Sequence, residues 1–285
     1  MIHRFGLSAL MLAGVIAVAP SANAFSAKGW QYSMDSFNDS SGGLPGGGSG
    51  VGENTNYEIR GIATQLFDGK LRIGIQSNLG IHGASSQYAD DGHIHWGDII
   101  INTACEALDN VGKESLFGIR FAQDNESGVQ QVGLFKNITL FEKADENGNP
   151  GANLAGHNQW VRDRKGNPSF GNLANGYFNE NTHVDTLIRS GEYVSGVNII
   201  QDTSGWDLDG FDGLRGQILG LEVDISSLAL SNGQTVCLHA SAECNNDIAG
   251  GQFVYDVPTP AAVLPVLSGL FAAAKRKNKK EEALG

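Results

Sequence analysis

The chain has 285 residues and a formal net charge of −12, with 31 acidic against 19 basic side chains. An acidic surface of this kind repels the phosphates of nucleic acids and anionic lipids, so we expect no nucleic-acid partner. The 39 glycines and 7 prolines stay below the fraction typical of low-complexity chains, and the length suits one large β domain.

Residues 1–24 have the pattern of a secretory signal. A weakly charged start is followed by an apolar run over 5–18, and Ala22-Asn23-Ala24 matches a small-residue cleavage site. We expect cleavage between Ala24 and Phe25, which leaves residues 25–256 as an extracellular β domain. The chain should therefore use the export machinery and reside in the cell envelope or the medium, outside the cytoplasmic membrane.

The body shows short apolar runs between Gly, Asn and Asp clusters, without long helical periodicity, which favours an antiparallel β protein. The clearest element is a hairpin of 57–67 and 70–78 around Asp68-Gly69. In its second strand Leu71, Ile73 and Ile75 share one face, which predicts a sheet buried on one side. We predict an all-β fold, a single antiparallel β-sandwich or jelly-roll-like domain. Further strands are expected at 29–37, 99–101, 116–121, 133–141, 216–225, 235–239 and 251–255, with an irregular excursion over 152–195.

Two stretches have residues suited to metal binding. His93 and His95 share one face of a strand, but no third ligand follows at a useful spacing, so a loop is the expected structure. Asp207, Asp209 and Asp212 form a dense acidic turn whose oxygens can wrap a hard cation, which makes calcium the candidate cofactor. The same pattern also fits an ordinary turn, or the paired carboxylates of a glycosidase.

The three cysteines leave their pairing open. Cys237 and Cys244 are close in sequence and, after export, can form a disulfide that leaves Cys105 over. The chain has no nucleophile elbow and no phosphate-binding loop. We therefore expect a protein without catalytic activity.

The end of the chain, residues 257–285, reads as a sorting signal. An uncharged run over 261–274 follows a short proline-rich motif, Val257, Pro258, Thr259 and Pro260. As a helix this run would be roughly 21 Å long, shorter than a hydrocarbon core of about 30 Å. A basic cluster follows, which favours the cytoplasmic side, so membrane contact through this hydrophobic sorting helix should be transient. The cluster includes Lys275, Arg276 and Lys277.

This tail resembles the sorting signal of the PEP-CTERM family, the exosortase-dependent surface proteins of bacteria. Its V-P-T-P form resembles the variant common in cyanobacterial members, with Thr259 where the family usually has Glu. Blocks of the body resemble members of the same family at 29–39, 57–63 and 96–98, and at His239 with 243–247, where Asn245 replaces the usual Gly. The resemblance implies processing near Pro258–Pro260 by an exosortase-type enzyme, followed by attachment to the cell surface or release, and it implies no catalytic residues.

The expected function is that of a non-catalytic surface or matrix protein, with an adhesive role suggested by the acidic, Gly- and Asn-rich surface. One alternative is a calcium-dependent, lectin-like module that binds extracellular polysaccharide. A second alternative is a secreted polysaccharide hydrolase.

Overall fold

The computed structural model describes residues 24–44, 49–87, 89, 91–143 and 153–256. The signal peptide before Ala24 and the sorting tail from Val257 to the end lie outside these residues. The predicted processing residues Pro258, Thr259 and Pro260 and the basic cluster at 275–277 therefore have no structural description.

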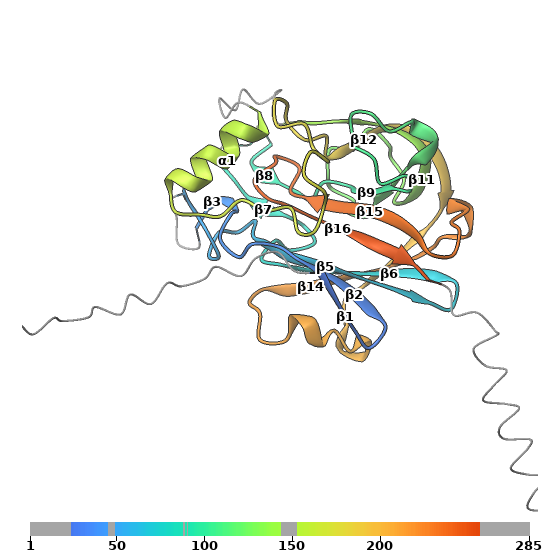
Figure 1. The fold of residues 1–285 in the computed structure, drawn as a ribbon. Helices are drawn as coiled ribbons and strands as arrows, with labels where there is room; N and C mark the ends of the chain where they lie inside the picture. The colour runs from blue at the N-terminus through green and yellow to red at the C-terminus, as the bar shows by residue number, and fades with distance from the viewer. Residues whose placement is uncertain (1–23, 45–48, 88, 90, 144–152, 257–285) are drawn as a thin grey trace, which may run out of the picture.

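Two six-stranded antiparallel sheets pack against each other (Figure 1). The first has the order β1 (Ala24–Ala27), β2 (Trp30–Met34), β5 (Ile59–Phe67), β6 (Lys70–Ser77), β14 (Gln217–Asp224), β13 (Val197–Ile200). The second has the order β12 (Leu187–Ser195), β11 (Gly133–Phe141), β10 (Leu116–Arg120), β9 (Ile99–Asn102), β15 (Gln234–Ser241), β16 (Ile248–Tyr255). The prediction of a β protein with antiparallel sheets is confirmed.

Smaller elements lie around the two sheets. Two short hairpins pair β3 (Ser41–Gly43) with β4 (Ser49–Val51) and β7 (Ala84–Ser85) with β8 (His93–Ile94). One α-helix, α1, spans Leu154–Asp163. Single 3-10 turns cover Lys113–Ser115, Ser204–Trp206, Asp209–Phe211 and Ser226–Leu228.

The main core fills the space between the sheets. Ile62, Ile73 and Ile75 of the first sheet belong to one buried cluster with Ile101 and Leu238 of the second. Burying a side chain of this size contributes about 1.5–3 kcal/mol, so this layer is the main source of stability. The alternation of apolar residues along the predicted strands thus identifies the faces that meet in the middle.

The predicted hairpin is confirmed, but the prediction that its sheet is buried on one face is wrong. Asp68 and Gly69 both have positive φ angles, 50° and 74°, as a tight hairpin turn requires. Gln76, on the supposedly open face, is only 3% exposed and donates to the Arg215 carbonyl. The segment between β13 and β14 covers this outer face (Figure 1).

The irregular excursion expected over 152–195 contains two regular elements. Helix α1 begins after Asn153, whose side chain accepts a hydrogen bond from the Gly156 amide. Its buried apolar positions, Leu154 and Val161, are too sparse to show a periodic stripe. Strand β12 lies at an edge of the second sheet with largely exposed side chains, so its sequence lacks the apolar run of a central strand.

Side chains tie the last strand to the first sheet. The Ser33 hydroxyl on β2 donates to the Gly250 carbonyl of β16 at 2.6 Å. The Gln31 side-chain amide donates to the carbonyl of Val254 and accepts from its amide, at 2.7 and 2.8 Å. These bonds occupy backbone groups at the free edge of β16, which would otherwise be open to another strand.

Candidate metal centre

Four carboxylates gather where strands of the two sheets end side by side. Asp35 follows β2, Asp39 precedes β3, Glu58 immediately precedes β5, and Asp247 immediately precedes β16. The ligand oxygens of Asp35, Asp39 and Asp247 all lie within 4.8 Å of one another. Within the described ranges this is the one group of three or more His, Cys, Asp or Glu residues that close. We call these four residues the carboxylate cluster.

The cluster is almost fully buried, with no member more than 4% exposed. Backbone amides hold one side of it: Ser169 donates to Asp39 Oδ2 at 2.7 Å, and Ile59 and Ile248 donate to Asp247 at 2.6 and 2.9 Å. These bonds come from both sheets and from the segment after α1, so they fix the carboxylates where these parts meet.

Three carboxylate oxygens of the cluster have no hydrogen-bond partner among the described residues: Asp35 Oδ2, Asp39 Oδ1 and Glu58 Oε1. Each belongs to a side chain whose other oxygen accepts a backbone amide. Burying a polar atom without a partner costs about 1–3 kcal/mol, and more for a charged one. The arrangement therefore leaves one oxygen of each of three side chains available to a ligand that the cluster surrounds.

The electrostatics of the cluster favour a bound cation. Burial raises the pKa of Asp35 to about 7, and burial together with the charge of Asp35 raises that of Glu58 to about 8. Burial and the neighbouring carboxylates raise the pKa of Asp39 and Asp247 well above the usual range. The nearby Arg60 guanidinium donates to Asn78 Oδ1 and the Glu53 carbonyl, and it offsets at most one of four negative charges.

The residues present fit calcium. Ca²⁺ takes six to eight oxygen ligands, including carboxylates and carbonyls, whereas Zn²⁺ prefers nitrogen and sulfur. Mg²⁺ keeps several of its waters, which suits a nearly dry cluster poorly. An all-oxygen set with an excess of negative charge therefore suits calcium, held by Asp35, Asp39 and Asp247 with Glu58 beside them.

We expect the cation-free protein to lose stability as the pH rises from 6.5 to 8.5. A carboxyl whose pKa is raised by folding stabilises the fold while it is protonated and loses that contribution as the pH rises through its folded pKa, here about 7 and 8 for Asp35 and Glu58. One pKa unit corresponds to about 1.4 kcal/mol, so the loss should reach a few kcal/mol.

Urea unfolding in the presence of a chelator measures this trend. The buried His157 and His239, whose pKa values burial lowers to about 4 and 3, destabilise the fold only below about pH 6.5, so the window avoids them. Excess calcium should remove the part of the decline that the carboxylate cluster contributes, because a cation favours the deprotonated ligands. The part due to Glu243, whose pKa burial also raises to about 7, should remain. A flat profile in chelator would contradict the expected burial of the four acids.

The calcium ligands predicted in the acidic turn do not form such a cluster. Lys28 Nζ lies 2.8 Å from Asp209 and 3.8 Å from Asp207, and both carboxylates are largely exposed. The residues between the acids have a packing role, since Leu208 and Phe211 belong to one buried cluster with Trp30 and Tyr32 of the first sheet. The acids of this segment therefore lie in an exposed turn. Asp212, Asp207 and Asp209 do not bring one ligand oxygen each within 4.8 Å of one another.

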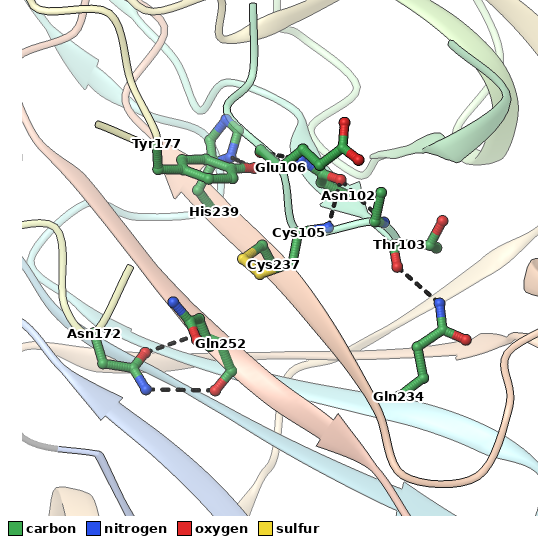
Figure 2. The surroundings of a disulfide bond; sticks show 11 residues. Asn102, Thr103, Cys105, Glu106, Asn172, Tyr177, Gln234, Cys237, His239 and Gln252 are labelled. Carbon is green, nitrogen blue, oxygen red and sulfur yellow. Dashed lines mark hydrogen bonds between the residues drawn. A yellow bond between two sulfur atoms is a disulfide. The ribbon is translucent and has the colours of Figure 1, made fainter. Parts of the chain in front are cut away.

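The disulfide differs from the pairing considered from sequence. Cys237 on β15 bonds to Cys105, whose Cα is 4.8 Å away (Figure 2). Cys244 is a free thiol. Cys105 lies in the turn after β9, where the Asn102 side chain accepts a hydrogen bond from the Cys105 backbone amide at 2.9 Å. Because Asn102 is also the β-sheet partner of Cys237, the turn brings the two sulfurs together across 132 residues. Burial raises the pKa of the Cys244 thiol to about 12.

The sequence reasoning missed all four members of the carboxylate cluster as ligands. Each is a single acid beside a strand, and 188 residues separate Ile59 from the Asp247 carboxylate that accepts its amide. The available signal was positional: Glu58 and Asp247 both stand directly against buried β-strands, where an unpaired acid is costly. Such an acid indicates either a buried partner or a cation.

Among the helices that the structure describes, none is long and apolar enough to cross a membrane. Searches with protein-family models, curated proteins and solved structures find no match to the chain.

Proposed function

We propose that this is an exported, non-catalytic protein of the bacterial cell surface or extracellular matrix, whose two sheets are held together by a buried calcium ion. The observation that carries the proposal is the carboxylate cluster: Asp35, Asp39 and Glu58 each keep an unpartnered oxygen, and they lie with Asp247, which adjoins a strand of the second sheet. Binding there links β2 and β5 of the first sheet to β16 of the second. Calcium sites of extracellular modules work at about 10⁻⁴–10⁻³ M, which matches a protein that meets calcium only after export.

The disulfide supports the proposed location. Cys105–Cys237 requires an oxidising compartment, and such bonds are rare in the cytosol. Together with the signal at 1–24 and the PEP-CTERM-like tail, it favours delivery across the cytoplasmic membrane, followed by exosortase-type processing near Pro258–Pro260.

Intact mass of the protein from its native cell, fractionated into envelope and medium, tests this sorting. A mass that begins at Phe25 and ends near Val257–Pro260 would support processing of the tail. A mass that retains residues 261–280 would mean that the tail is a plain anchor, and the exosortase-type processing would be wrong.

The burial of the cluster favours a structural role over catalysis. Its carboxylates lie inside the protein, whereas the paired acids of a glycosidase must flank a polysaccharide chain. Incubation of the purified protein with a panel of polysaccharides should release no reducing sugar. Turnover that disappears on substitution of any of its acids would contradict this proposal and support the hydrolase alternative.

A second candidate function, saccharide binding, is favoured by a polar cavity of about 510 Å³. Amide and carboxylate side chains such as Asn179 and Asp109 line it beside the ring of Phe178, a mixture suited to sugar hydroxyls. The Asn179 side-chain amide donates a hydrogen bond to Asp109 at 2.8 Å, which fixes both side chains in the lining. A glycan array probed with and without chelator tests this function, and an adhesive role would lose its support if the protein bound neither cells nor polysaccharide.

A further inference from the structure

Two histidines lie together outside the carboxylate cluster. His93 on β8 and His95 just after it are two residues apart, and their ring centroids lie 4.7 Å apart with 31° between the ring planes. His95 is only 8% exposed. The Nδ1 atoms of both rings are buried and have no hydrogen-bond partner in the described part of the chain. Each ring therefore retains a nitrogen available to a ligand.

A carboxylate from a distant turn lies against the backbone of His95. Glu243 lies in the turn between β15 and β16. Its Oε1 accepts a hydrogen bond from the His95 amide at 2.7 Å, and its own amide donates one to the His95 carbonyl at 3.1 Å. The side chain of Glu243 is 4% exposed, and its Oε2 is buried without a partner among the described residues. The double contact fixes the carboxylate against the backbone of His95.

Further acids make the surroundings negative. Asp91 Oδ2 lies 3.7 Å from His95 Nε2, and the charges of Asp124 and Glu126 also act on His95. Ring nitrogens without hydrogen-bond partners in an acidic setting attract a cation more readily than an anion or a sugar.

We propose that His93, His95 and Glu243 form a second cation site, which takes a borderline transition-metal ion such as Zn²⁺ or Cu²⁺. Two imidazoles and one carboxylate are the ligand set these ions prefer, in contrast to the all-oxygen carboxylate cluster. As placed, the three side chains do not bring one ligand atom each within 4.8 Å of the others, so binding includes rotation of the imidazole rings.

The two sites share one turn. Glu243 and Asp247 stand four residues apart in the connection between β15 and β16, and each accepts backbone amides of a different segment. The turn is closed by hydrogen bonds from Ala242 to the Asp247 carbonyl and from Asn245 to the Ala242 carbonyl. A transition metal on one side and a hard cation on the other would hold this short turn from both directions.

Calorimetric titration of the purified full chain with ZnCl₂ tests the site, with saturating calcium present so that zinc does not enter the carboxylate cluster. We expect one zinc per chain. His93→Asn, His95→Asn and Glu243→Gln should each weaken binding at least about tenfold. Glu243→Gln retains an acceptor for the His95 amide, so its effect reports the lost charge and ligand. His82→Asn is the matched control, because that side chain is 82% exposed and contacts Asp124.

Two results of the titration would overturn the proposal: no zinc binding to the wild type, or equal loss of affinity in His82→Asn and in the other variants. Circular dichroism and the melting temperature of each variant show whether it has folded. The electron paramagnetic resonance spectrum of bound Cu²⁺ gives a second measurement that a folding defect does not mimic. It should show two coordinated nitrogens in the wild type and one in His93→Asn, and an unchanged spectrum in that variant would also overturn the proposal.

Discussion

Calcium should raise the melting temperature of the purified protein by roughly 5–10 °C once its concentration reaches about 100 times the dissociation constant. A ligand at that excess stabilises the folded state by about 2.7 kcal/mol. In a domain of this size each kcal/mol shifts the melting temperature by about 2–4 °C. The physical reason is the neutralisation of buried carboxylates that the chain alone cannot pair.

Asp39→Asn should abolish this calcium response. Asp39 Oδ2 accepts the Ser169 amide while Oδ1 is unpartnered, so an asparagine can keep the hydrogen bond through its carbonyl and place its amide at the other position. The substitution therefore removes one charge and one ligand atom without removing a hydrogen bond. In chelator at pH 8 the variant should be at least as stable as the wild type, because a buried negative charge is gone. Differential scanning fluorimetry with and without calcium measures both effects.

The control is a variant of the exposed acidic turn, Asp207→Asn with Asp209→Asn. These carboxylates contact Lys28 at the surface, where solvent screens an ion pair and its contribution to stability is small. Its calcium response should equal that of the wild type. If the response were lost in the turn variant and kept in Asp39→Asn, calcium would bind in the turn, as the density of acids in the sequence predicted, and the assignment of the carboxylate cluster would be wrong.

The contrast between these two groups of acids shows how far the sequence can predict the site. A local run such as Asp207 to Asp212 is visible in one window, but a turn of acids and glycines is equally the chemistry of a solvated loop. The cluster depends on which strands lie side by side, and the pairing of β2 with β5 and the packing of β16 against both are set by the whole fold. No window of the sequence contains that information.

The strands themselves were more accessible to prediction. The hairpin of β5 and β6 follows from local turn chemistry. Strand β11 follows from an apolar stretch, interrupted by Lys136, Asn137 and Thr139, that begins at a glycine and ends before charged residues. Strand β12 and helix α1 were missed because their stability comes from contacts with other segments and not from local pattern. The same reason explains the cysteines: proximity in sequence favoured Cys244, while sheet register placed Cys105 next to Cys237.

Removal of the disulfide should have the largest single effect on stability. The bond closes a loop of 132 residues, and the chain-entropy model gives about 4.7 kcal/mol for a loop of 100 residues. We expect the double substitution Cys105→Ala with Cys237→Ala to lower the free energy of unfolding by about 3–5 kcal/mol, since measured values usually fall below the entropic limit. Urea denaturation of the calcium-loaded protein measures the difference, and reductant should reproduce it in the wild type.

Cys244→Ala is the matched control and should retain the effect of reductant, because Cys244 is the free thiol. Thiol labelling under denaturing, non-reducing conditions distinguishes the two pairings directly. The wild type should label at Cys244 alone, and Cys105→Ala should expose a second reactive thiol at Cys237. If Cys105 labels in the wild type and its substitution leaves stability unchanged, the bond joins Cys237 to Cys244. It would then close a loop too short to tie the turn after β9 to the last hairpin, and the large stabilisation expected from the long loop would be absent.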